Sequence, residues 1–158
     1  MPPLKAHGMR VEIPAGWDAR IFRRAPRPGA RTAAVVHAGN FALPPGRGDF
    51  GSGAVEIMLD HHVLVVLMEH GPESAGSPLF AQQGPPTSLT AADFDPNGLQ
   101  RGLPGQGGLQ RFFTWEGRPF VLYIVLGNYL RRARLVPIVN AFLSGLTLAD
   151  LGSSEAQG

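Results

Sequence analysis

The sequence predicts a single α+β domain with a central, mostly antiparallel sheet of about seven strands and a C-terminal helix packed on it. Three observations predict this class: short apolar runs of period 2, Gly- and Pro-rich turns between them, and one apolar pattern of helical period near the C-terminus. A chain of 158 residues fits one domain. We therefore expect this domain over residues 1–150 and a flexible tail over 151–158.

Seven runs have the composition of strands, and turn sequences separate several neighbours. The expected strands cover 9–13, 19–24, 32–38, 54–59, 62–69, 110–115 and 120–126. The expected tight turns are Pro14-Ala-Gly-Trp17, Asp60-His61 and Glu116-Gly117, the last with a glycine that favours positive φ. Because such turns join antiparallel neighbours, the sheet should be largely a meander.

The apolar positions of the strands predict how the sheet is covered. Run 9–13 alternates apolar with charged residues, which is typical of a strand with one face in water. Runs 62–69 and 120–126 are apolar at both parities, so both faces must be covered there.

One segment near the C-terminus has the period of an amphipathic helix. Its apolar positions at i, i+3, i+4 and i+7 are Val139, Phe142, Leu143 and Leu146. We expect a helix over 135–145, with Pro137 in its first turn, Gly145 near its C-cap and Thr147-Leu148 extended beyond it.

A Gly- and Pro-rich insertion over 70–108 is too long for an ordinary connection. We expect one short helix in it, over 90–94, with Ser88 or Thr90 as N-cap. The insertion fits a lid over a pocket, a contact for a partner, or a mobile connector, and the sequence leaves these alternatives open.

Composition excludes several classes of chemistry. The chain has no cysteine, which rules out disulfides and Cys-based metal sites. It has 14 basic and 12 acidic side chains, an excess too small to indicate a nucleic-acid partner. No stretch approaches the length of a membrane span, and the first residues lack the apolar run of a signal peptide. We expect a cytoplasmic protein without a membrane partner.

The segment LDHHVLVVLMEH, residues 59–70, suggests either a metal or catalytic site or the middle of a sheet. Neighbouring residues of a strand point to opposite faces, which would keep His61 and His62 apart. His62 and His70 would be roughly 26 Å apart. We therefore expect a turn at Asp60-His61 followed by a core strand, no metal site within the segment, and solvated histidines; a meeting with His7 or His37 through the fold stays open.

The sequence shows no recognisable catalytic or cofactor motif. It lacks the phosphate-binding loop, the dinucleotide-binding glycine pattern and the nucleophile elbow. No carboxylates stand at a spacing that implies general acid and base roles. We therefore assign no catalytic residue, no cofactor and no metal.

Two basic groups and a Gly-rich loop, LPGQGG, are candidates for contact with a partner. The arginines lie around the second expected strand and before the helix, and the loop lies at 103–108. Solvated arginines and an ordinary connector are the alternative interpretations. The candidate residues are Arg20, Arg23, Arg24, Leu103, Pro104, Gln106, Arg131 and Arg132.

The order of several segments resembles the Mog1/PsbP-like group of α/β/α sandwiches. These are the turn in "VEIPAGW", the hairpin "FFTWEGRPFVLYIVLG" and the closing helix with an extended end, "VPIVNAFLSGLTL". The resemblance covers most of the chain but rests on pattern, and it carries over no binding residues. It implies helices on both faces of an antiparallel sheet, and members that mostly bind or help to assemble other proteins.

These observations favour a non-catalytic interaction or assembly module whose partner is another protein or a second copy of the chain. The expected edge strand over 19–24 offers one route to self-association. A small enzyme or ligand-binding protein with a pocket under 70–108 is the alternative. Nucleic-acid binding through the arginines is a third hypothesis, and it predicts affinity that falls steeply with salt.

Overall fold

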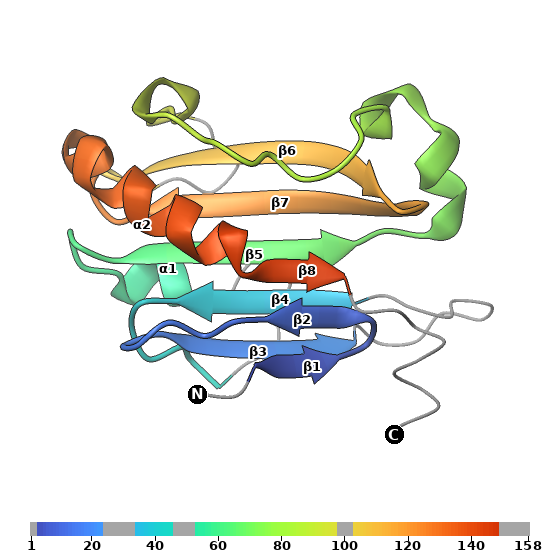
Figure 1. Cartoon of the computed structure of the whole chain (residues 1–158). Helices are drawn as coiled ribbons and strands as arrows, with labels where there is room; N and C mark the ends of the chain where they lie inside the picture. The colour runs from blue at the N-terminus through green and yellow to red at the C-terminus, as the bar shows by residue number, and fades with distance from the viewer. Residues whose placement is uncertain (1–2, 24–33, 46–52, 98–102, 149–158) are drawn as a thin grey trace.

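A computed structural model describes residues 3–23, 34–45, 53–97 and 103–148. These residues form two antiparallel sheets, one of five strands and one of three. The large sheet has the order β3-β4-β5-β7-β6, with β3 at Asp18–Arg23, β4 at Ala34–Gly39, β5 at Val63–Glu69, β7 at Arg118–Leu126 and β6 at Gly107–Trp115. The small sheet has the order β1-β2-β8, with β1 at Leu4–Ala6, β2 at Met9–Val11 and β8 at Leu146–Leu148. In Figure 1 the small sheet lies in front of the large one.

The prediction of one seven-stranded sheet is therefore wrong, and two features cause the difference. The strand expected at 9–13 pairs with β1 and β8 instead of joining the large sheet. The strand expected at 54–59 is a short helix, α1, at Ala54–Ile57. Because β4 pairs directly with β5, with His37 opposite Val66, the large sheet has no position for a strand between them.

The predicted hairpin over 110–126 is confirmed. Strands β6 and β7 pair along their whole length, from Trp115 opposite Arg118 at the turn to Gly107 opposite Leu126 at the far end. Their turn has φ of 50° at Glu116 and 80° at Gly117, as a two-residue turn of the primed class requires. The Pro14–Trp17 turn is also present, closed by a 3.1 Å backbone hydrogen bond from Trp17 to Pro14. It carries the chain from the small sheet to the large one and does not join paired strands.

One face of the large sheet packs against the small sheet and the helix α2, Arg132–Ser144. This helix starts earlier than predicted, because Arg132-Ala133-Arg134 continues the single 3₁₀ turn η4, Tyr129–Arg131, into a helix. Pro137 is consequently inside the helix and not in its first turn, which corrects the prediction. Gly145 is the C-cap and β8 follows, as expected.

The other face of the large sheet is covered as well, as the doubly apolar strands predict. Buried side chains of β5 and β7 meet Ala54 and Val55 of α1 on this side. Partly buried side chains complete the cover: Phe41, Leu43, Met58 and Phe112. The two faces of β5 therefore belong to two separate hydrophobic clusters.

The insertion over 70–108 packs along the outer edge of β6 in the part that the structure describes (Figure 1). The described part forms three short 3₁₀ helices: η1 at Pro72–Gly76, η2 at Pro78–Phe80 and η3 at Ala91–Asp93. Thr90 caps η3, as one of the two predicted N-caps. Buried Phe80, Leu89 and Phe94 fill its underside.

Polar contacts also fasten the insertion to the body. Two isolated β-bridges connect its backbone to β6: Gln83 pairs with Thr114, and Asp95 pairs with Gly108. The side-chain amide of Asn140 on α2 accepts from the Leu89 N–H at 3.0 Å and donates to the Leu89 carbonyl at 2.9 Å. The insertion thus covers an edge strand, which would otherwise be open to pairing with another chain.

Within the residues that the structure describes, no helix has both the length and the apolar character that crossing a bilayer requires.

Candidate functional site

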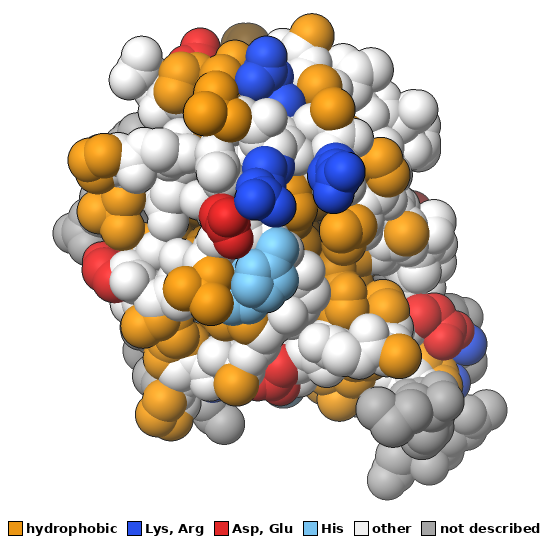
Figure 2. Space-filling model, turned by 90° about the vertical axis from the view of Figure 1, so that its left-hand side faces the viewer, with side chains coloured by type: hydrophobic (Ala, Val, Ile, Leu, Met, Phe, Trp, Pro, Cys, Tyr) orange, Lys and Arg blue, Asp and Glu red, His pale blue; other side chains and the backbone are white. Residues whose placement is uncertain are grey.

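Charged side chains gather at both ends of the large sheet, and the two ends differ in exposure. At one end, β5 begins and β7 ends. Figure 2 shows histidine, acidic and basic side chains side by side on this face, bordered by hydrophobic side chains. We call this surface the histidine end and define it as Leu59, Asp60, His61, His62, Leu130 and Arg131.

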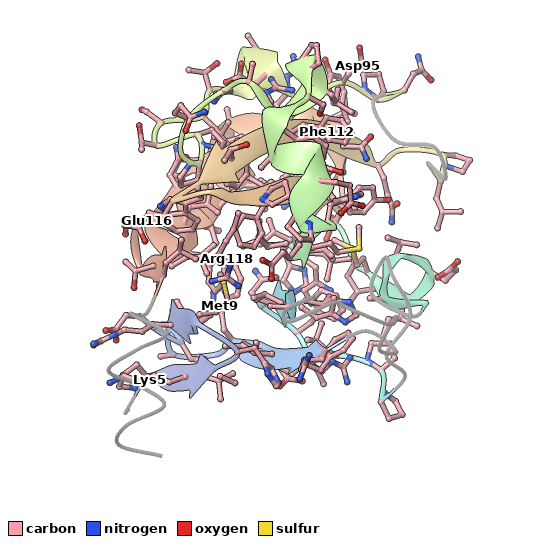
Figure 3. The ribbon with its side chains drawn as sticks, turned by 90° about the vertical axis from the view of Figure 1, so that its right-hand side faces the viewer. Lys5, Met9, Asp95, Phe112, Glu116 and Arg118 are labelled. Carbon is pink, nitrogen blue, oxygen red and sulfur yellow. The ribbon has the colours of Figure 1, made fainter. Side chains whose placement is uncertain are left out.

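The opposite end carries a buried ion pair that serves the fold. Arg118 binds both carboxylate oxygens of Glu69, at 2.8 and 2.9 Å. The same guanidinium donates to the carbonyls of His7 and Gly8, each at 3.2 Å. Figure 3 shows Arg118 beside Met9, between the small sheet and the large one. Because these groups are used to join the two sheets, this end is not a candidate binding surface.

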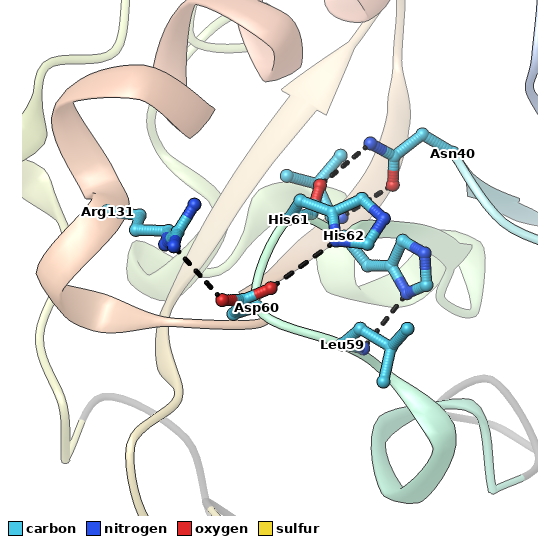
Figure 4. Close-up of polar contacts among 7 residues, drawn as sticks. Asn40, Leu59, Asp60, His61, His62 and Arg131 are labelled. Carbon is cyan, nitrogen blue, oxygen red and sulfur yellow. Dashed lines mark hydrogen bonds and ion pairs between the residues drawn. The ribbon is translucent and has the colours of Figure 1, made fainter.

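A tight turn before β5 builds the histidine end (Figure 4). The His62 N–H donates to the Leu59 carbonyl at 3.1 Å, which closes the turn. Gly127, just after β7, donates its N–H to the His62 carbonyl at 2.8 Å. A Cβ at position 127 would overlap the Leu59 carbonyl oxygen, so only glycine lets the two backbones approach this closely.

His62 is held on both sides. Its Nδ1 accepts a 2.9 Å hydrogen bond from the Leu59 N–H, and its ring stacks on Phe41 with centroids 4.7 Å apart. Partial burial lowers the pKa of His62, and the neighbouring His61 lowers it further. Because Nδ1 is an acceptor, neutral His62 carries its proton on Nε2 and offers a donor there.

Asn40, which follows β4, fastens the turn to the sheet. Its amide donates to the His61 carbonyl at 3.1 Å and accepts from the Val63 N–H at 2.8 Å. Sequence reasoning missed both Asn40 and Phe41, because their partners lie about twenty residues away. An Asn at a strand end is a common turn residue, and this was the only signal available.

Asp60 connects the turn to η4. Its carboxylate lies 3.4 Å from His61 Nδ1 and 3.2 Å from the Arg131 guanidinium. The hydrogen bond from His61 holds the pKa of Asp60 below its usual value, and the Arg131 charge lowers it further. Asp60 and Arg131 are each about half exposed, so the pair adds little stability and remains accessible to a partner.

The Gly-rich loop and the second basic group meet beside this surface. The Tyr129 N–H donates to the Gly105 carbonyl at 2.7 Å, and the Arg132 guanidinium lies 4.1 Å from the Tyr129 ring centre. Leu103 and Pro104 are exposed, whereas Gln106 is buried and donates its amide to the Val55 carbonyl at 2.8 Å. Five of the candidate residues therefore lie in one region: Leu103, Pro104, Gln106, Arg131 and Arg132.

The first basic group lies elsewhere. Arg20 and Arg23 belong to β3, which is the edge strand farthest from β6 in the large sheet. The Arg20 side chain is half-buried and donates to the Pro44 carbonyl. Arg24 lies outside the described residues. The described arginines of the two groups thus stand on separate elements and do not form one basic surface.

The histidines converge only in part. The rings of His61 and His62 lie 4.3 Å apart, because both residues precede β5 and the alternation expected in a strand does not apply. His70 follows the far end of β5, and His37 lies in the middle of β4. Within the described ranges, no group of three or more His, Asp or Glu side chains is arranged to hold a metal ion.

Large apolar side chains surround the Asp60–Arg131 pair. Leu130 is 83% exposed, Leu59 58% and the nearby Ile57 of α1 52%. They stand on a turn and a helix end that hydrogen bonds hold in place. No family model, curated protein or solved structure matches the chain. What the histidine end does must therefore be inferred from its own residues.

Proposed function

We propose that the protein is a non-catalytic interaction or assembly module and that it binds a partner protein through the histidine end. The observation that carries this proposal is the exposure of Leu130 and Leu59 on either side of the Asp60–Arg131 pair. Apolar side chains that gather on one surface are typical of contact sites. Hydrogen bonds already order the turn beneath them, which lowers the entropy that binding would cost.

The polar groups of the surface suit recognition better than chemistry. The Asp60 carboxylate holds His61 and Arg131, and His62 Nδ1 is used by the Leu59 N–H. A partner can cover Leu130 and Leu59 while pairing with the accessible half of Asp60 or Arg131. Arginine is enriched in protein interfaces, where its planar donors and its stem both contribute.

The resemblance to the Mog1/PsbP-like group agrees with this proposal. Members of that group mostly bind or help to assemble other proteins. The structure departs from a simple sandwich of that kind, because the three-stranded sheet shares one face of the large sheet with α2 and only the four-residue α1 lies on the other.

Capture of partners by the tagged full chain tests the proposal. The two variants are Leu130→Asp, on the histidine end, and Leu79→Asp on η2 as a matched control, since Leu79 is 59% exposed. We expect a stoichiometric partner with the natural chain and with Leu79→Asp, and its loss with Leu130→Asp. Purified partner and purified variants should reproduce the difference in a direct binding assay. A partner that binds both variants equally would reject the histidine end as the contact surface.

A further inference from the structure

Beyond Arg134, the outward side of α2 lacks the charges of an ordinary surface helix. The exposed residues on this side are Ala133, Arg134, Pro137, Ile138, Ala141 and Ser144. Residues 135–148 contain no charged side chain at all. A helix exposed to water normally carries polar and charged residues on its outer side. In Figure 1 α2 lies at the front of the molecule, and no described element covers it.

We infer that a second copy of the chain covers this side, with the two α2 helices packed antiparallel about a twofold axis. Ala133, Pro137 and Ala141 are spaced by four residues and form a ridge of short side chains. Short side chains let two helices approach closely. In the antiparallel arrangement Pro137 faces Ala141 of the second copy, so the ridge is complementary to itself, as a twofold interface requires.

The charges at the ends of α2 favour the same arrangement. The helix has no acidic residue in its first turn and no basic residue in its last turn. Arg131, Arg132 and Arg134 stand instead at its N-terminus, where the helix dipole disfavours positive charge. Antiparallel packing brings Arg134 to the C-terminal end of the other helix, where the dipole favours it.

An acidic side chain is present at that C-terminal end. The Glu12 N–H donates to the Gly145 carbonyl at 2.9 Å. Glu12 packs so close to Gly145 that a Cβ there would lie 2.8 Å from the Glu12 Cβ. The Glu12 side chain is 52% exposed and is paired with Arg10. Each copy therefore offers Glu12 to Arg134 of the other, which forms two equivalent ion pairs in the dimer.

This dimer is separate from the contact assigned to the histidine end. The N-terminus of α2 lies beside the histidine end, so an antiparallel dimer directs the two histidine ends away from each other. Such a dimer would present two partner sites and could bind a repeated partner with avidity.

Sedimentation or light scattering over a range of protein concentrations tests whether the full chain forms a dimer. Variants that reverse the charges of Arg134 and Glu12 test the proposed ion pairs. We expect the natural chain to be dimeric at tens of micromolar and Ala141→Arg to be monomeric. Arg134→Glu and Glu12→Arg should each raise the dimer Kd about tenfold, because two equivalent pairs change sign. The double variant Arg134→Glu/Glu12→Arg should recover most of the affinity.

Folding defects and other interfaces are distinguishable from this result. Arg134→Glu places a carboxylate at a helix N-terminus, which favours the helix, so a monomeric Arg134→Glu chain is not explained by unfolding. Leu130→Asp should remain dimeric, so loss of its partner and loss of the dimer are separate outcomes. The proposal is overturned if the natural chain is a monomer or if Ala141→Arg is still a dimer. It is also overturned if the double variant dimerises no more tightly than the single variants.

Discussion

Glu69 and Arg118 form a two-pronged ion pair that joins the end of β5 to the start of β7 and extends to the small sheet. Their side chains are only 4% and 13% exposed. Arg118 also contacts the ring of Phe120, 5.2 Å from its centre, and Glu69 accepts from the Ala34 N–H at 3.2 Å. One buried pair thus connects β1-β2, β4, β5 and β7.

Removal of Arg118 is expected to destabilise the protein far more than removal of an exposed arginine. Arg118→Ala takes the guanidinium from a buried carboxylate, which costs about 3–5 kcal/mol in comparable pairs. Arg131→Ala breaks a half-exposed pair that water and salt screen, so it should change the free energy of unfolding little. Urea unfolding of both variants measures the free energy of unfolding. Equal losses would contradict the structural role of the Glu69–Arg118 pair.

Asn140 is expected to hold the 70–108 insertion on α2. Asn140→Leu removes both hydrogen bonds to Leu89 and leaves two backbone groups of the insertion without those partners, which should cost about 1–3 kcal/mol. Amide hydrogen exchange should rise across residues 84–97 in the variant. Ser144→Ala, on the outer side of the same helix, is the control and should leave exchange unchanged. Unaltered protection in Asn140→Leu would show that the apolar contacts of Phe80, Leu89 and Phe94 are sufficient.

Gly127 is expected to be required for the shape of the histidine end. Gly127→Ala forces the new Cβ against the Leu59 carbonyl and should cost about 3 kcal/mol, as overpacking against a backbone does. Gly76→Ala is the matched control, because a Cβ at Gly76 meets no atom within 4 Å. Thermal unfolding gives the stabilities, and NMR of the imidazole protons of His61 and His62 reports the turn. A shift of these signals in Gly76→Ala and none in Gly127→Ala would refute this assignment.

His62 is expected to make stability depend on pH. Its folded-state pKa lies below the ordinary value of 6.5, so the unfolded chain takes up its proton first as pH falls. The stability from neutral His62 is therefore complete above about pH 6.5 and is lost progressively below it. Protonation of Nδ1 would also break the hydrogen bond from Leu59.

A variant that keeps the acceptor but does not titrate isolates this effect. His62→Asn should fold with a smaller decrease in stability between neutral and mildly acidic pH. The remaining decrease includes His7, whose pKa is lowered by burial and then by Arg23. Chemical unfolding at a series of pH values measures the difference. Parallel pH profiles for the natural chain and His62→Asn would exclude His62 as a contributor.

Local patterns in the sequence predicted much of the architecture. The hairpin at Glu116-Gly117 depends on one positive-φ turn between two adjacent runs, and the end of α2 depends on its apolar period and Gly145. Both are short-range properties. The segment 54–59 was misassigned because an apolar run this short fits a strand or a helical turn equally well. The direct pairing of β4 with β5 decided the outcome.

The histidine end was predicted only in fragments. The sequence indicated the Asp60-His61 turn and singled out Leu103, Pro104, Arg131 and Arg132. It did not indicate that Asn40, Phe41 and Gly127 hold the turn, because these contacts join segments that are far apart along the chain. The convergence of His61 and His62 was missed because the expected strand included His62, whereas both histidines precede β5.

Elements with local causes are predictable from the residues alone: the doubly apolar strands that need cover on both faces, the glycine turns and the C-terminal helix. The division into two sheets, the packing of the insertion on β6 and the assembly of the histidine end arise only when the whole chain folds. Period and turn chemistry act over a few residues. Strand partners and buried ion pairs such as Glu69–Arg118 are instead chosen by the packing free energy of the whole chain.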